Sequence, residues 1–147
     1  MPIEQDIGVI AHVIQLAVAP VFLLTGIGAF LGVMSGRLAR VIDRARRVEG
    51  MWKEYDGKAR ARAHEELAIL KRRARLAYWA INFCTCAALL VCTVVAMLFV
   101  EAFVGANLKW IIGSLFVLAM IALIGGLTSF LREIYFATRT LRIGPPD

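Results

Sequence analysis

Three long stretches of this sequence contain no Asp, Glu, Lys or Arg, and they constrain the fold more than any other feature. They cover residues 7–36, 76–100 and 110–131. Each exceeds the roughly 20 apolar residues that a helix needs to cross a hydrocarbon core about 30 Å thick. Lipid offers the backbone no hydrogen-bond partners, so helices are the expected spanning form. The sequence therefore predicts an all-α membrane protein with three transmembrane helices.

The basic residues lie mainly on one side of these predicted spans. Residues 37–75 hold 13 of the 17 Lys and Arg residues, and the C-terminal segment 132–147 holds three more. Lys109 is the only basic residue in the short connection 101–109. By the positive-inside rule, we expect residues 37–75 and the C-terminal tail in the cytoplasm. The N-terminus and the loop 101–109 are then expected outside.

The basic connection keeps a helical spacing of apolar residues in both of its halves. The intervals alternate between three and four, as in the seam between two paired helices. These residues are Leu38, Val41, Ala45, Val48 and Trp52 in the first half, and Ala63, Leu67, Leu70, Ala74, Ala77 and Ile81 in the second. One antiparallel register pairs every position of the first half and places a turn near residues 56–58, where Asp-Gly favours a turn. We predict a cytoplasmic antiparallel helical hairpin that continues the first two spans.

A row of arginines lies on a face of the first half turned away from this seam. Its members are Arg37, Arg40, Arg44 and Arg47. One interpretation is a solvated face that sets the topology. The other is contact with anionic lipid headgroups, worth about 1 kcal/mol per basic residue near the membrane surface. The predicted register also brings Arg44 near Arg73, a juxtaposition that an acidic partner or a lipid phosphate would explain. No nucleic-acid recognition fold accompanies these residues, so nucleic acid is not an expected partner.

Small residues inside the spans are candidates for helix packing. Gly28, Gly32 and Gly36 form two overlapping G-x-x-x-G units, a spacing that lets helices approach closely in lipid. The partner helix belongs either to the same chain or to another subunit. Gly125 and Gly126 give the third span a similar small-residue site.

Polar residues inside the spans are candidates for a polar path. They are His12, Gln15, Asn82, Thr85 and Thr128. The alternative is that they form hydrogen bonds between helices. Arg132 and Glu133 lie at the inner end of the third span, where we expect them to anchor the boundary.

The sequence offers no catalytic or metal-binding pattern. Cys84, Cys86 and Cys92 all fall in the second span and do not form a tetrahedral set of ligands. We find no phosphate loop, zinc signature or nucleophile elbow. We therefore expect no enzymatic activity, no cofactor and no metal.

Four segments carry a resemblance to a known family. They read APVFLL, RLARVIDRARRV, LKRRARL and FLREIYFA. They resemble the landmarks of a small bacterial integral-membrane family that is catalogued only as a domain of unknown function, over nearly the whole chain. The resemblance implies a three-span protein of the bacterial cytoplasmic (inner) membrane, and it implies no activity or site residues.

Two functions fit these features. The first is a non-enzymatic membrane protein that self-assembles, with an ion-conducting homo-oligomer as one form of it. The order of the spans is similar in layout to the ExbB/TolQ/MotA proton-channel family, although no charged residue lies deep in a span. The alternative is an accessory or scaffold subunit of a larger membrane complex. That subunit would dock through the hairpin, with Trp52 and Tyr55 at the tip as its contact residues.

Overall fold

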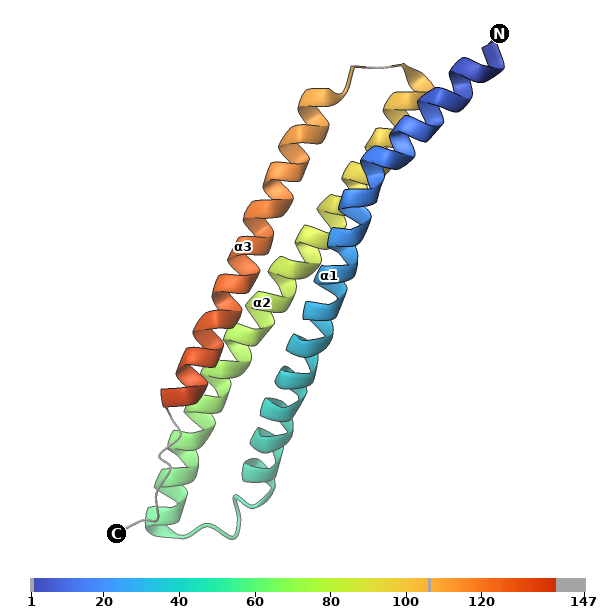
Figure 1. Ribbon diagram of the computed structural model, residues 1–147. Helices are drawn as coiled ribbons and strands as arrows, with labels where there is room; N and C mark the ends of the chain where they lie inside the picture. The colour runs from blue at the N-terminus through green and yellow to red at the C-terminus, as the bar shows by residue number, and fades with distance from the viewer. Residues whose placement is uncertain (1, 106, 140–147) are drawn as a thin grey trace. The chain divides into compact units, whose positions relative to one another are not determined.

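The described part of the protein folds into three α-helices. The computed structural model describes residues 2–105 and 107–139. The helices are α1 (Pro2–Gly50), α2 (Gly57–Val104) and α3 (Lys109–Arg139), labelled in Figure 1. Each contains a stretch long and apolar enough to cross a membrane. The predicted all-helical class with three candidate spans is thus confirmed.

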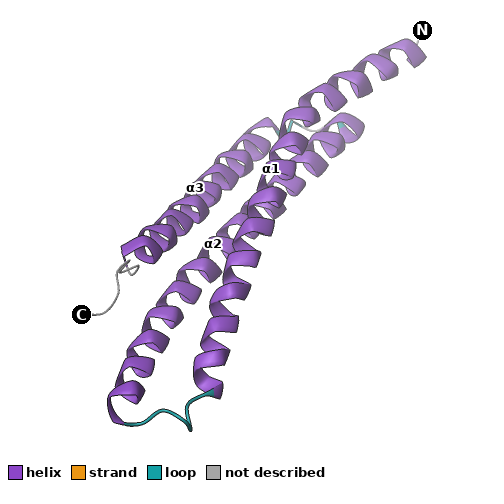
Figure 2. Cartoon of the chain, turned by 60° about the horizontal axis from the view of Figure 1, so that its bottom comes forward, coloured by secondary structure: helices purple, strands orange, loops and turns teal. Residues whose placement is uncertain are grey.

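The connection between α1 and α2 is a short turn at residues 51–56, drawn in teal in Figure 2. Its backbone closes with hydrogen bonds from the Trp52 amide to the Glu49 carbonyl (3.1 Å) and from the Glu54 amide to the Met51 carbonyl (2.9 Å). Gly57, the first residue of α2, has a φ of +38°, in the region that residues with a Cβ adopt only at a cost. The reversal therefore ends at the glycine of the predicted Asp-Gly turn.

The far end of α2 is set by a second glycine. Gly105 has a φ of +68°, and its amide donates to the Glu101 carbonyl at 2.9 Å. A left-handed residue just after a helix satisfies one of the last carbonyls and prevents another turn from forming. This cap ends α2 at Val104, and α3 begins at Lys109.

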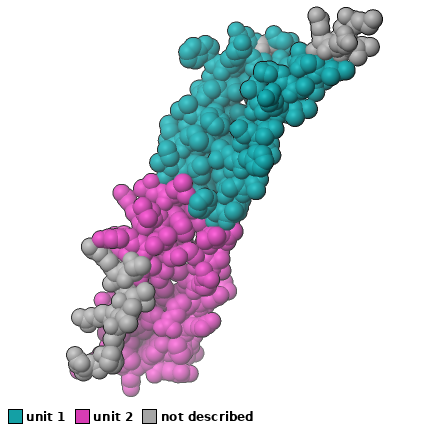
Figure 3. Space-filling model, viewed as in Figure 1, with its two compact units in different colours: residues 1–31, 83–124 teal, residues 32–82, 125–147 magenta. Residues whose placement is uncertain are grey.

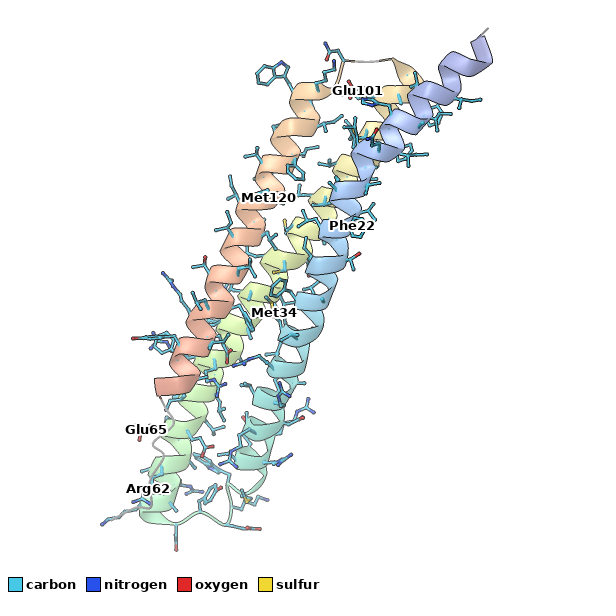
Figure 4. All side chains as sticks on the ribbon, in the orientation of Figure 1. Phe22, Met34, Arg62, Glu65, Glu101 and Met120 are labelled. Atoms are coloured by element: carbon cyan, nitrogen blue, oxygen red, sulfur yellow. The ribbon has the colours of Figure 1, made fainter. Side chains whose placement is uncertain are left out.

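The chain divides into two compact units, shown in Figure 3, and each takes a segment from every helix. Unit 1 comprises Met1–Leu31 and Phe83–Ile124. Many of its large apolar side chains point outward: Phe22, labelled in Figure 4, is 73% exposed. Its buried positions are mostly small or medium-sized: Val13, Ala17, Ile27, Cys84, Ala87, Val91, Val94 and Ala119. Small buried residues and large exposed ones are the distribution expected of helices that pack against one another in lipid.

Unit 2 comprises Gly32–Asn82 and Gly125–Asp147. Within it, the apolar positions that the sequence singles out fall on the less exposed sides of α1 and α2. Every one of those positions is buried or half-buried, whereas most of the residues between them are exposed. Val41, Ala45, Leu70 and Ala74 line one groove between the two helices. These positions of α1 and α2 therefore lie opposite one another in the structure.

One series of buried residues recurs every seven positions along each helix. An ideal helix drifts only about 20° per seven residues, so this spacing keeps the buried positions close to one line. The line comprises Val13, Pro20, Ile27, Met34, Val41 and Val48 in α1, Ala63, Leu70, Ala77, Cys84 and Val91 in α2, and Ala119, Gly126 and Glu133 in α3. The last member of the series in α3 is Glu133, a charged residue that an apolar pattern does not predict at a buried position.

Candidate functional site

The buried carboxylate of Glu133 is the centre of the main polar site in unit 2. Glu133 is 1% exposed, although it lies on α3 between the exposed Arg132 and the half-buried Ile134. Its burial follows from its position, seven residues after the buried Gly126. An isolated ionised carboxylate in such a place would cost far more than a folded protein tolerates. The surrounding residues must therefore supply opposite charge.

Two arginines, one from each of the other helices, supply that charge. Arg73 of α2 donates to Oε1 of Glu133 from Nε at 3.2 Å and from Nη2 at 2.9 Å. Nη2 of Arg37, on α1, lies 3.0 Å from Oε2. The two guanidiniums remain partly accessible, with side-chain exposures of 24% and 30%. One carboxylate thus joins α1, α2 and α3 within unit 2 through a cluster of net charge +1.

The two sides of this cluster differ in geometry. Arg73 forms two hydrogen bonds, whereas the contact between Arg37 and Oε2 is close enough for an ion pair but is not aligned for a hydrogen bond. Among the described residues, the buried Nε of Arg37 also lacks a partner. The Arg37 guanidinium lies 5.6 Å from the ring centroid of Phe130, so the ring stabilises its positive charge. Arg37 therefore keeps an unused donor.

A second ion pair lies farther along the two helices. Nε of Arg44 donates to Oε1 of Glu66 at 2.7 Å, and both side chains are substantially exposed. This pair and the cluster at Glu133 explain the close approach of Arg44 and Arg73 that the sequence left unexplained. Each of these arginines has its own carboxylate, on α2 and α3 respectively, so the explanation is intramolecular.

A groove between α1 and α2 brings four arginines together. Its volume is about 330 Å³, and its lining consists of Arg37, Arg40, Arg44, Arg73, Val41 and Leu70. Val41 and Leu70 are buried and form its apolar part. Neither Glu66 nor Glu133 lines the groove. The arginine row predicted from sequence is thus split, because Arg47 does not line this groove and Arg73 from the other helix does.

The two aromatic residues predicted for docking are engaged within their own unit. The Arg60 guanidinium lies 5.4 Å from the Trp52 ring centroid, and the His64 ring lies 6.4 Å from it. The Tyr55 hydroxyl approaches the Met51 sulfur at 4.0 Å. Both aromatic side chains are half-buried. Their contacts with the chain leave only part of each ring open to a partner.

The glycines of α1 face open space. A Cβ placed on Gly28, Gly32 or Gly36 would meet nothing within 4 Å among the described residues. At about 100° per residue, this row lies about 140–160° around the helix from the buried Ile27 and Met34. None of the described residues therefore uses the close approach that the G-x-x-x-G spacing allows. The two candidate glycines of α3 are less exposed than those of α1: Gly126 is buried and Gly125 is half-buried.

The residues predicted to form a polar path do not all point to one place. His12 lines a groove of unit 1 with Glu101 and Lys109, and the volume of this groove is about 780 Å³. Glu101 is labelled at the end of α2 in Figure 4. The Asn82 amide donates to the Tyr78 carbonyl of its own preceding turn at 2.8 Å. Gln15, Thr85 and Thr128 are exposed.

Sequence reasoning missed Glu133, Glu66 and Arg73 as members of a site. Glu133 follows Arg132 at the end of an apolar run, and such a pair is typical of a membrane boundary. The signal that identifies it is its spacing of seven and fourteen residues from Gly126 and Ala119, two small residues in the same series. Glu66 was missed because it belongs to the pair Glu65-Glu66, which is typical of a solvent-exposed helix face.

The fold and these contacts define a multi-pass helical membrane protein. Three apolar helices are long enough to span a membrane, and a charged cluster joins segments of all three within unit 2. Residues 17–143 match the family described as a protein of unknown function (DUF2721), and the chain belongs to that family. Comparison with curated proteins and with solved structures gives no match.

Proposed function

We propose that this protein is a non-enzymatic integral membrane protein that assembles with copies of itself through the glycine face of α1. We define this face as Gly28, Gly32 and Gly36. The proposed setting is the bacterial inner membrane. The N-terminus would lie outside, and residues 37–75 would lie in the cytoplasm as an antiparallel hairpin.

The observation that carries this proposal is the open space beside the three glycines. Helices in lipid gain little from the hydrophobic effect, so their association depends on close packing, and small residues at this spacing permit it. The other side of the same helix is already buried against the chain at Ile27 and Met34. A second copy is a fitting partner, because the same patch on two subunits can pair with itself across a two-fold axis.

The cytoplasmic placement is supported by charge and by contacts. Residues 37–75 hold 13 of the 17 basic residues, and such an excess marks the cytoplasmic side of a multi-pass protein. The pairing of the two arms is supported by the ion pair of Arg44 with Glu66 and by the stacking of Arg60 on Trp52. Non-enzymatic function is supported by the polar site itself, whose charged groups are ion-paired rather than arranged as nucleophile and base.

Assembly is tested by blocking the glycine face. Gly32→Leu places a bulky side chain in the middle of this face and should convert the assembly to monomers in mild detergent. Native mass spectrometry and light scattering after size-exclusion chromatography measure the mass. Gly26→Leu is the matched control, because Gly26 also faces open space but lies about 120° away around the helix. A monomeric wild type, or equal masses for both variants, would refute assembly through this face.

Two further functions have weaker support. Ion conduction by the assembly would need a wet path, and its support is limited to the groove that His12 lines with Glu101 and Lys109. Docking to a larger complex through the hairpin tip would use Trp52, which is already stacked on Arg60. The open glycine face supports self-assembly more directly than either of them.

A further inference from the structure

The groove lined by Arg37, Arg40, Arg44 and Arg73 carries more positive charge than the chain itself neutralises. Glu133 pairs with Arg37 and Arg73, and Glu66 pairs with Arg44. Arg40 forms no ion pair with any described residue. Four guanidiniums against two carboxylates leave a net charge of +2 (4 − 2 = 2). This excess is concentrated on one hollow between two helices.

The donors of these arginines are only partly used. The Nε of Arg44 donates a hydrogen bond to Glu66, and the Nε and Nη2 of Arg73 donate hydrogen bonds to Glu133. The Nε of Arg37 lacks a partner among the described residues, but it is buried and is therefore not among the donors that an entering anion can reach. Both carboxylates approach from outside the groove, since neither of them lines it. The remaining N–H groups are therefore available to an anion that enters from solvent or from the membrane surface.

The shape and surroundings of the groove favour a small multivalent anion. Its volume of about 330 Å³ falls at the lower end of the roughly 300–1,000 Å³ typical of small-molecule sites. Val41 and Leu70 form an apolar floor, which lowers the local dielectric and strengthens each charged contact. The planar fork of a guanidinium matches the oxygens of a phosphate group and binds them in pairs.

The position of the groove along the chain indicates where the phosphate comes from. The charge-free run of α1 ends at residue 36, and that of α2 begins at residue 76. Arg37 directly adjoins the first of these ends and Arg73 lies three residues before the second, and Arg44 lies about 10 Å farther along α1 at 1.5 Å per residue. The headgroup layer on each side of a bilayer is about 5–8 Å thick. A phospholipid headgroup at this level would reach the groove.

We propose that this arginine groove binds an anionic phosphate group, supplied by a phospholipid headgroup or by a soluble phosphate. The inference is independent of self-assembly, because the glycine face does not line the groove. It also differs from general attraction of a basic segment to an anionic membrane, since it assigns the binding to four named residues and leaves out Arg47.

The test uses the purified full chain with Arg40→Gln, which removes a charge without breaking an ion pair. Native mass spectrometry counts the phosphatidylglycerol molecules retained from mixed micelles, with phosphatidylcholine as the zwitterionic reference. Titration with inorganic phosphate measures binding of the soluble form. Arg47→Gln is the matched control, with the same charge change on the same helix but outside the groove.

The expected result is roughly fivefold weaker binding for Arg40→Gln, the factor that corresponds to the loss of one basic contact near a membrane. Arg47→Gln should bind like the wild type. Loss of phosphatidylglycerol alone identifies a lipid headgroup as the source, and loss of inorganic phosphate binding identifies a soluble one. Equal loss in both variants would mean diffuse surface charge and would overturn the proposal. Absence of binding to either probe would overturn it as well.

Discussion

The contribution of Glu133 to stability should change sign when its two arginines are removed. In the wild type, the carboxylate accepts two hydrogen bonds from Arg73, at 2.9 and 3.2 Å, and lies 3.0 Å from Arg37. In a chain with Arg37→Gln and Arg73→Gln, the same carboxylate, 1% exposed in the wild type, loses both cations. Replacing it by glutamine therefore has opposite consequences in the two backgrounds.

The magnitudes follow from the exposure of each group. Hydrogen bonds to charged groups contribute about 1.5–3 kcal/mol each. The arginines are 24% and 30% exposed, so water recovers part of that loss when the carboxylate is removed. Glu133→Gln should then cost about 2–4 kcal/mol in the wild type. In the double variant, the unpaired buried charge is itself unfavourable by several kcal/mol. There, Glu133→Gln should stabilise the protein by about 1–3 kcal/mol.

Thermal unfolding in detergent, followed by circular dichroism, measures these differences. At about 2–4 °C per kcal/mol for a chain of this size, Glu133→Gln should lower Tm by about 5–15 °C in the wild type and raise it in the double variant. Arg132→Gln is the control, because Arg132 is exposed and lies next to Glu133 in the sequence. Equal effects of Glu133→Gln in both backgrounds would show that the carboxylate is not coupled to Arg37 and Arg73.

The other two predictions concern the contact of α1 with α2. Glu66→Gln should lower stability by less than about 1 kcal/mol, because its pair with Arg44 is exposed on both sides, and 0.5 M salt should remove even this difference from the melting curve. In a chain lacking Cys84, Cys86 and Cys92, cysteines introduced by Ala45→Cys and Leu70→Cys should form an intramolecular disulfide under mild oxidation, because both positions line one groove. A mobility shift on a non-reducing gel reports the crosslink, and its failure would contradict the register.

The spacing of apolar residues was sufficient to predict the helices and which of their positions are buried or half-buried. Val41, Val48 and Leu70 are buried where the three–four spacing places them, because that spacing keeps them on one face of a helix. The register also placed Arg44 near Arg73, and both line the same groove. Asp-Gly favours a turn, and the glycine of this pair, Gly57, is the first residue of α2 and has a left-handed conformation.

The polar site was less predictable, because it depends on how α3 packs against the other two helices in unit 2. A glutamate beside an arginine at the end of an apolar run is equally consistent with an exposed anchor and with a buried ion pair. Only the contacts of Arg37 and Arg73 distinguish the two. The glycines present a similar ambiguity, since G-x-x-x-G spacing predicts close approach without naming the partner. Because a Cβ on Gly32 would meet nothing within 4 Å, none of the described residues packs closely against this glycine.

The packing of α3 in unit 2 depends on charge as well as on apolar contact. Its fully buried positions among the described residues there are Gly126 and Glu133, and glycine has no side chain to bury. A step of one residue would turn α3 by about 100° and carry Glu133 away from both guanidiniums. That rotation would lose the two hydrogen bonds from Arg73 and the ion pair with Arg37. The carboxylate therefore fixes the rotation of α3, and this requirement explains why a charged residue occupies a position that the seven-residue series otherwise fills with small or apolar side chains.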